Sequence, residues 1–527
     1  MNCLTFFLPV FLLASLPALA QTGSLKNPSN RDSPSNRDSP SIRNSIDAIT
    51  TAIRKNPLTA ESCPIQLASL SAYIRELDPR SSGLGAAEVD PAPLLSAAFE
   101  ARILLRNRYR ALYEQNRLSL ECVRAMRAAF RHLRGLEDYL GITGYQKAFA
   151  RALRDQNASR RENPAGVIPP ANLYPADATR VARPALPLEP LVIFPAIRGL
   201  PGPSYLPSGT LVNPILKNAP GLRSGDVLLS RGNANVSALI ARMADDDTQF
   251  SHLALIHVDP ASGVPYTIEA HIEHGSIILP LSEWLKDGKV RTVVFRQKDQ
   301  ALAAEAARVM YETVKRRAGA GNPVEYDFSF NMHDHERLFC SEIIRVGYEI
   351  ASSGRLEVPA YPSRFTMKNR DLFDRLGITE KESFLPEDIE MDPRFELLAE
   401  WRDFRNLGAS IRKDAILTAM VDWMERYHYR FDPSNWQAIK AGLGKLLRKA
   451  GYMKDKMPTY MSYSAVELSI MVDELVAIIE KDLAPHERRR LQESGLALTY
   501  VDYEAQLKSI RQSAARSKNG FYPYFHP

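Results

Sequence analysis

The spacing of apolar residues divides the chain into two helical parts and a central part of mixed structure. Between residues 44 and 160, apolar positions such as Ile46 and Ile49 recur at helix-like spacing among Arg, Glu and Gln, which predicts amphipathic helices. Residues 97–140 contain few helix-breaking residues, so two long helices are expected there. Helical spacing returns from about residue 411 to 515 and predicts a second helical region.

Between the helical parts, short apolar runs alternate with turn residues. The runs that predict strands are residues 227–229, 252–258, 266–272 and 290–296. The segments that predict helices are residues 236–243, 301–317 and 340–352. The sequence Asp-Pro-Ala-Ser-Gly at residues 259–263 is typical of a tight turn between two strands. We therefore expect an α+β block with a small antiparallel sheet, flanked by N- and C-terminal helical domains.

Composition sets the boundaries of these parts. Residues 1–20 contain a short apolar run and an Ala-Leu-Ala site, and they predict a signal peptide, with an uncleaved anchor as the alternative. A repeated Ser-Asn-Arg-Asp-Ser-Pro unit predicts a disordered linker at residues 21–43, and many prolines predict an extended linker at residues 163–221. The expected domains are then a helical domain, the α+β block and a second helical domain, at residues 44–162, 222–405 and 406–527. A signal peptide implies a periplasmic or secreted bacterial protein.

Overall charge excludes little. The net charge of +6 is small for 527 residues, and no base-stacking aromatic motif accompanies it, so nucleic acid is not expected as a partner. Peripheral contact with an anionic membrane is the most that this charge indicates. The predicted N-terminal helices are rich in Arg and Leu. A solvated surface with structural arginines is the favoured interpretation of that pattern, and a docking or substrate-guiding bundle is the alternative.

Three cysteines remain after the predicted signal peptide. Cys63 and Cys122 lie in the same predicted helical region, and an oxidising compartment makes a disulfide between them plausible. Cys340 would then be the free thiol. It lies where a loop turns into a predicted helix, and a helix N-terminus stabilises a thiolate. The alternative is that all three are buried structural thiols.

The turn at residues 259–263 sets the register of the hairpin around it. If the turn centres near residues 261–262, His252 faces a residue close to 269–272 on the return strand. His252 can therefore lie beside Glu269 or His271 on one face of the sheet. With Cys340 at a facing helix tip, these residue types supply a nucleophile, a base and an orienting acceptor.

Two histidine clusters raise the question of a metal. His271 lies near Glu273 and His274, and His333 and His335 flank an aspartate. Neither cluster has the spaced third ligand of a known metallohydrolase motif. We therefore expect no metal and no other cofactor.

A set of short motifs in the central block carries a resemblance to a known family. The motifs, in chain order, are GDVLL at residues 225–229, FSHLALI at 250–256, IEA at 268–270, YD at 326–327 and FCSEII at 339–344. They resemble the YiiX type of circularly permuted NlpC-like cysteine hydrolases. In that family the papain-like fold is cut and rejoined, so that the His and the polar residue precede the Cys. The resemblance covers roughly residues 222–405 and implies a permuted papain-like block.

The resemblance implies a role for each candidate residue. Cys340 would attack a carbonyl as a thiolate held by His252, and Glu269 would orient the imidazole. His271 competes with Glu269 for that third role, because the return strand departs from the family pattern in its extra histidines. Asp226, Tyr326 and His271 are the candidates for substrate binding. The backbone N–H of Cys340 would stabilise the oxyanion.

The expected function is an exported thiol hydrolase that cleaves an amide bond, with cell-wall peptide as the leading substrate. Two alternatives stay open. One is a lipid or N-acyl amide hydrolase or acyltransferase of the same fold. The other is a non-catalytic envelope scaffold, because the two helical regions together are longer than the enzymatic block needs. Those regions could also cover the cleft and restrict substrates.

Overall fold

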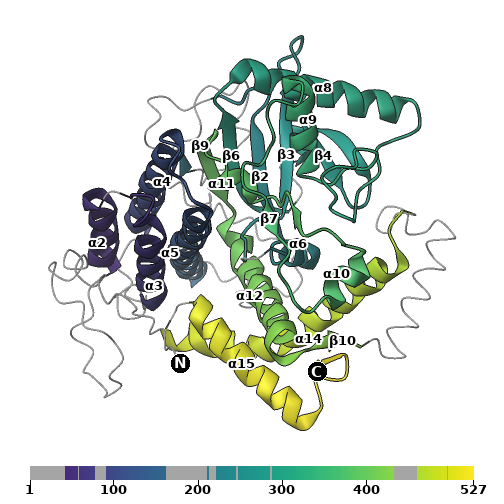
Figure 1. Cartoon of the computed structure of the whole chain (residues 1–527). Coiled ribbons are helices and arrows are strands. Elements are labelled where there is room, and N and C mark those ends of the chain that lie inside the picture. The colour runs from purple at the N-terminus through teal and green to yellow at the C-terminus, as the bar shows by residue number, and fades with distance from the viewer. Residues whose placement is uncertain are drawn as a thin grey trace, which may run out of the picture.

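In the computed structural model, helices pack around a seven-stranded sheet (Figure 1). The described residues are 42–56, 58–77, 91–161, 211–212, 221–244, 247–284, 288–432, 460–494 and 497–527. The predicted signal peptide and nearly all of both predicted linkers lie outside them. Within the described residues, no helix combines the length and the apolar character needed to cross a bilayer.

The central sheet has the strand order β1-β9-β6-β2-β3-β4-β5, and all neighbouring strands are antiparallel. Its strands are β1 Leu211–Val212, β2 Val227–Gly232, β3 His252–Val258, β4 Pro265–His271, β5 Gly275–Pro280, β6 Lys289–Gln297 and β9 Phe395–Arg402. The predicted α+β class with an antiparallel sheet is confirmed. Strands β1, β5 and β9 were not expected from the sequence, and β1 lies within the predicted linker at residues 163–221.

Alternation along the strands gives the sheet two different faces. Leu253, Leu255 and Ile268 point to the face covered by α8 Gln300–Gly319 and α9 Glu342–Ser352. Ala254 and Ile256 point to the other face, where they pack against Trp284 of the short helix α7 Leu281–Trp284. The two faces of β3 are therefore covered by different elements.

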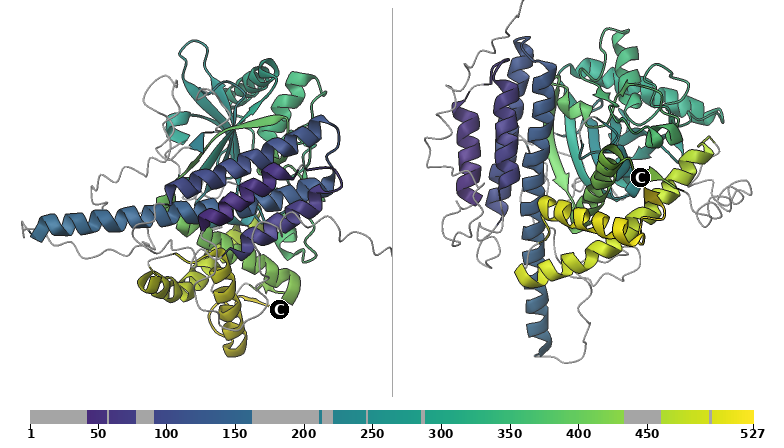
Figure 2. Two further views of the ribbon diagram at one scale, coloured as in Figure 1. Left: turned by 90° about the vertical axis from the view of Figure 1, so that its left-hand side faces the viewer. Right: turned by 60° about the horizontal axis from the view of Figure 1, so that its bottom comes forward.

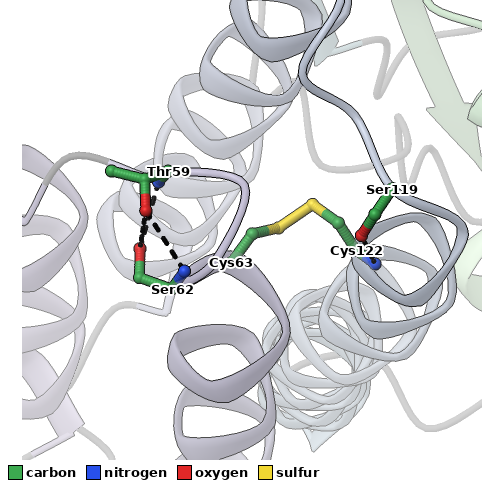
Figure 3. Close-up of a disulfide and its surroundings, with 5 residues drawn as sticks. All are labelled: Thr59, Ser62, Cys63, Ser119 and Cys122. Atoms are coloured by element: carbon green, nitrogen blue, oxygen red, sulfur yellow. Dashed lines mark hydrogen bonds between the residues drawn. A yellow bond between two sulfur atoms is a disulfide. The ribbon is translucent and has the colours of Figure 1, made fainter.

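Four N-terminal helices run side by side along one side of the sheet (Figure 2). They are α2 Ile42–Lys55, α3 Cys63–Glu76, α4 Ala92–Glu114 and α5 Leu120–Arg161. Helix α2 buries Ile42, Ile46, Ile49 and Ile53, as the spacing predicted. Cys63 and Cys122 form a disulfide that joins the starts of α3 and α5 (Figure 3). Cys340 is then a free and buried thiol.

Several arginines of α4 and α5 are buried, which corrects the expected solvated face in part, whereas Arg124 stays exposed. Arg102 and Arg134 are almost wholly buried and pair with Glu400 of β9 and with Glu390. Glu390 belongs to α11 Asp388–Met391, which precedes β9. The buried ion pairs connect the helical layer to β9 and α11, so these arginines have a structural role.

The C-terminal region packs against the central block and, through its first helix, against α5. Its helices are α12 Phe404–Tyr427, α14 Tyr463–Ser494 and α15 Tyr500–Ser517, and a strand pair is formed by β10 Arg430–Phe431 and β11 Phe525–His526. Phe521 and Phe525 of the aromatic tail pack around Trp423 of α12. Apolar residues of these helices belong to the same core as β2, β3 and β4, so the C-terminal helices and the sheet form one packed unit.

The remaining elements are short and connect the sheet to the helices. They are α6 Asn235–Ile240, α10 Asp371–Leu376 and the strand pair β7 Ser363–Arg364 with β8 Glu382–Ser383.

Candidate active site

The hairpin β3–β4 brings three polar side chains together at one end of the sheet. Its ladder runs from Val258↔Pro265 to Leu255↔Ile268, so the turn is centred where the sequence predicted. His252 Nε2 lies 2.5 Å from Glu269 Oε2, and His271 Nε2 lies 3.0 Å from the same oxygen. The two imidazoles meet edge to face, with ring centroids 5.3 Å apart. The sequence left Glu269 and His271 as alternatives, and the fold brings both to His252.

Glu269 is the buried centre of this cluster. Trp284 Nε1 donates to its Oε2 over 3.0 Å, and Thr267 Oγ1 donates to its Oε1 over 3.2 Å. Burial acts to raise the pKa of Glu269, but the hydrogen bonds and charges of His252 and His271 outweigh it and hold that pKa far below its usual value. Glu269 is therefore a carboxylate at neutral pH and only accepts hydrogen bonds.

The carboxylate fixes the proton on His252. Since Glu269 only accepts, the Nε2 of a neutral His252 carries the proton, and Nδ1 is left as the basic nitrogen. Burial lowers the pKa of His252 below its ordinary value of 6.5, against the opposing effect of Glu269. For His271 the effect of Glu269 outweighs that of burial, and its pKa is raised. The pKa of His252 is therefore shifted down and that of His271 up, and a neutral His252 presents Nδ1 as a proton acceptor.

Cys340 approaches this cluster from the other face of the sheet. Ile343 and Ile344 of α9 pack among Leu253 and Leu255, and this contact places Cys340 at the start of β3. Residues 252–254 pair with β2 but lie beyond the ladder to β4. The backbone N–H of Leu253 there hydrogen-bonds the Cys340 thiol. Cys340 therefore contacts the residue that directly follows His252 at the start of β3.

Electrostatics in this closed site differ from the thiolate–imidazolium pair that the resemblance implied. Burial raises the pKa of Cys340 above its ordinary value, although Leu253, Ser341 and the Cys340 backbone act to lower it. The thiol has 3% of its surface exposed and makes a contact of 3.9 Å with Ser341 Oγ. With the pKa of His252 lowered, the resting pair is neutral. An attack by Cys340 on a carbonyl would then require general-base catalysis, in which the thiol proton moves as the sulfur attacks.

Glu342 holds the turn that carries Cys340. Its Oε2 accepts the backbone N–H of Phe339 over 3.3 Å, and His335 Nδ1 lies 3.2 Å from its Oε1. Burial raises the pKa of Glu342 to about 9. The sequence analysis missed this role. No local pattern indicated it, because Phe339 is not a capping residue and the N-cap of α9 is Ser341.

The other two substrate-binding candidates lie in different places. Tyr326 is buried, and burial together with the nearby Cys340 raises its pKa well above the ordinary value, so it lies at the site. Asp226 does not. It lies four residues before Ser230, which pairs with His252, and is therefore about 13 Å away along β2. Its carboxylate forms a two-oxygen ion pair with Arg296, at 2.7 Å for each oxygen, which is a structural role.

The cluster around Glu269 could also hold a metal ion. In the part of the chain that the structure describes, His252, Glu269 and His271 are the group whose ligand atoms lie close enough together, all within 4.8 Å of one another. The expected candidate His274 stacks against His271, at 6.4 Å between ring centroids, but is outside that group. A cation bound there would take the Nε2 atoms of both histidines and break the hydrogen bonds to Glu269.

Comparison with known proteins bears on the central block. Residues 221–399 match the model of the family described as permuted papain-like amidase enzyme, YaeF/YiiX, C92 family. The crystal structure of the metalloprotein yiiX from Escherichia coli O157:H7 is similar, at 22% sequence identity and a TM-score of 0.28, over 34% of this chain and 98% of that chain. No curated protein matches the chain. The family match confirms the resemblance to YiiX-type proteins and indicates a hydrolase of the papain-like type.

Proposed function

We propose that this protein is an exported cysteine hydrolase that cleaves an amide bond, with cell-wall peptide as its substrate class. The observation that carries the proposal is the 2.5 Å contact between His252 Nε2 and Glu269 Oε2. This contact leaves Nδ1 of His252 as the basic nitrogen, at the start of β3, where Leu253 contacts Cys340. The family match supports the amide bond. The apolar N-terminal run and the disulfide support export, and the small positive charge allows peripheral membrane contact.

The chemistry takes two steps. In the first, Cys340 Sγ bonds to the carbonyl carbon while its proton passes to His252 Nδ1, and that proton then leaves with the amine as the C–N bond breaks. In the second, His252 takes a proton from water, the water oxygen attacks the thioester, and the thiol is restored as the acid leaves. The backbone N–H groups of Cys340 and Ser341, at the start of α9, would stabilise the oxyanion.

Capture of the thioester tests this proposal directly. The protein is incubated with cell-wall peptides and, in parallel, with N-acyl amino acids and lipid amides, quenched in acid and digested for mass spectrometry. We expect an acyl group on the peptide that contains Cys340 and amine release from the cell-wall peptides. Amine release without acylation of Cys340 would contradict the cysteine mechanism. Acylation by lipid amides alone would favour the lipid alternative, and no reaction at all would favour a scaffold.

The raised pKa of Cys340 gives a prediction for pH dependence. Alkylation of the thiol by chloroacetamide requires the thiolate, so its rate should rise with pH with a midpoint above 9. Cys63 and Cys122 are joined in a disulfide, so among the described cysteines Cys340 is the one that can be alkylated. Cys340→Ala is the control. The rate is followed by mass spectrometry between pH 5 and pH 10. A plateau that persists to pH 6 would instead show a preformed thiolate–imidazolium pair.

A further inference from the structure

A tyrosine from the C-terminal region lies at the rim of the candidate active site. The hydroxyl of Tyr460 donates to the backbone oxygen of Ile272 over 2.9 Å, and Ile272 directly follows His271. Burial raises the pKa of Tyr460 to about 12, against the backbone N–H groups of Gly275 and Tyr326, which also reach its hydroxyl. Three backbone groups around the site therefore hold this side chain in place. Tyr460 lies outside the residues 221–399 that match the family.

The position of these backbone groups is set by a close approach of two segments. Ser276 donates its N–H to Val324 O over 2.8 Å, at the start of β5. Gly275 has a φ of 70°, and a Cβ there would lie 2.1 Å from Val324 O, so only glycine fits. The segment that follows Val324 then pairs with Leu338, two residues before Cys340. The rim that Tyr460 contacts is thus tied to the nucleophile by backbone hydrogen bonds.

Aromatic rings connect Tyr460 to Cys340. Phe328 lies between Tyr460 and Tyr326, with ring centroids 6.3 Å and 5.0 Å away, respectively. Tyr326 is the ring that interacts with Cys340. These three rings differ in exposure. Tyr326 is buried, whereas Phe328 and Tyr460, together with Ile272 beside Tyr460, are partly exposed. The aromatic rings therefore run from the buried Tyr326, which interacts with Cys340, to the partly exposed Phe328 and Tyr460.

We infer that Phe328 and Tyr460 form an apolar subsite beside Cys340 that binds an apolar group of the substrate next to the bond it cleaves. The inference rests on the proposed function in one respect, namely that Cys340 is the reacting thiol. Partly exposed aromatic surface that is fixed by hydrogen bonds binds apolar groups without a large loss of conformational entropy. The C-terminal region thereby sets specificity, and neither the sheet nor α9 alone supplies this wall.

Two alkylating probes of different size test the subsite without knowledge of the substrate. Chloroacetamide and N-phenethylchloroacetamide carry the same reactive group, and the second adds an apolar ring. We expect the second to label Cys340 about tenfold faster than the first at pH 9, relative to their rates with free cysteine. That ratio should fall to about one to two in Tyr460→Ala and persist in Tyr460→Phe, which keeps the ring. Tyr427→Ala, at the exposed end of α12, is the matched control and should leave the ratio unchanged.

Each other result has a defined meaning. An unchanged ratio in Tyr460→Ala, or a ratio near one in the wild type, would overturn the subsite. Failure of both probes to label Cys340 would also overturn it, because the apolar surface would not open onto the thiol. If Tyr460→Ala does not fold, Tyr460→Leu should give an intermediate ratio, and a full ratio there would overturn the inference. The labelling ratio does not require turnover, so failure of the proposed hydrolase function is detected separately by thioester capture.

Discussion

Replacement of Cys340 by alanine is expected to lower the rate of acyl transfer by about ten-thousandfold or more, because the attacking sulfur is lost. His252→Ala should cost about a thousandfold or more, since no other described side chain at the start of β3 is placed to take the thiol proton. The rates are measured as kcat/KM for an activated ester such as p-nitrophenyl acetate and for the amide identified by thioester capture. Cys340→Ser tests the same point with a side chain of similar size.

His271→Ala is the matched control for His252→Ala. Both imidazoles bond to the same oxygen of Glu269, but His252 adjoins Leu253, whose N–H bonds the Cys340 thiol, whereas His271 lies on the next strand. We expect His271→Ala to lower kcat/KM by less than about tenfold. Equal losses in the two histidine variants would mean that they act as a unit around Glu269. A full rate in Cys340→Ala would remove the thiol from the mechanism altogether.

The register of the central hairpin could be predicted because it depends on local chemistry. The Asp-Pro-Ala-Ser-Gly turn fixes the pairing of β3 with β4, and a period of two residues then places His252, Glu269 and His271 on one face. The turn itself is held by Asp259 Oδ1, which accepts the backbone N–H groups of Ala261 and Ser262 over 2.8 Å each. A candidate site that rests on such a turn can therefore be found from sequence.

Features that depend on distant segments could not be predicted in this way. Strand β9 pairs with β6, and its residues meet arginines about 250–300 positions earlier, so no local pattern marked Arg102 or Arg134 as buried. The same limit applies to the pKa of Cys340. A helix N-terminus indicates a lowered value, but burial raises the pKa instead and outweighs the hydrogen bond from Leu253. Tyr460 reaches the site from outside the resemblance, and nothing in its own sequence context indicates that position.

Glu400→Gln is expected to lower the free energy of unfolding by about 3–5 kcal/mol, the largest stability effect that we predict. Burial acts to raise the pKa of Glu400, but Arg102, Arg402, Arg134 and Arg291 outweigh it and hold that pKa well below its usual value. Glu400 is fully buried, and its Oε1 lies 2.7 Å from Arg402 Nη2 and 3.4 Å from Arg134 Nε. Glutamine keeps the shape but removes the charge, so the guanidinium groups lose attraction that offsets their own burial.

Urea unfolding followed by circular dichroism measures this effect, with Glu312→Gln as the matched control. Glu312 is 61% exposed and pairs with Arg308 at 2.7 Å, so the same substitution should cost less than about 1 kcal/mol there. Because the pKa of Glu400 is depressed in the folded state, its contribution is present above the unfolded value of about 4.3 and is lost as pH falls. The stability difference between the wild type and Glu400→Gln should therefore start to shrink below about pH 4.3 and vanish only below the depressed pKa of the folded state. A difference that stays constant as pH falls would show that the charge of Glu400 is not the source of the loss.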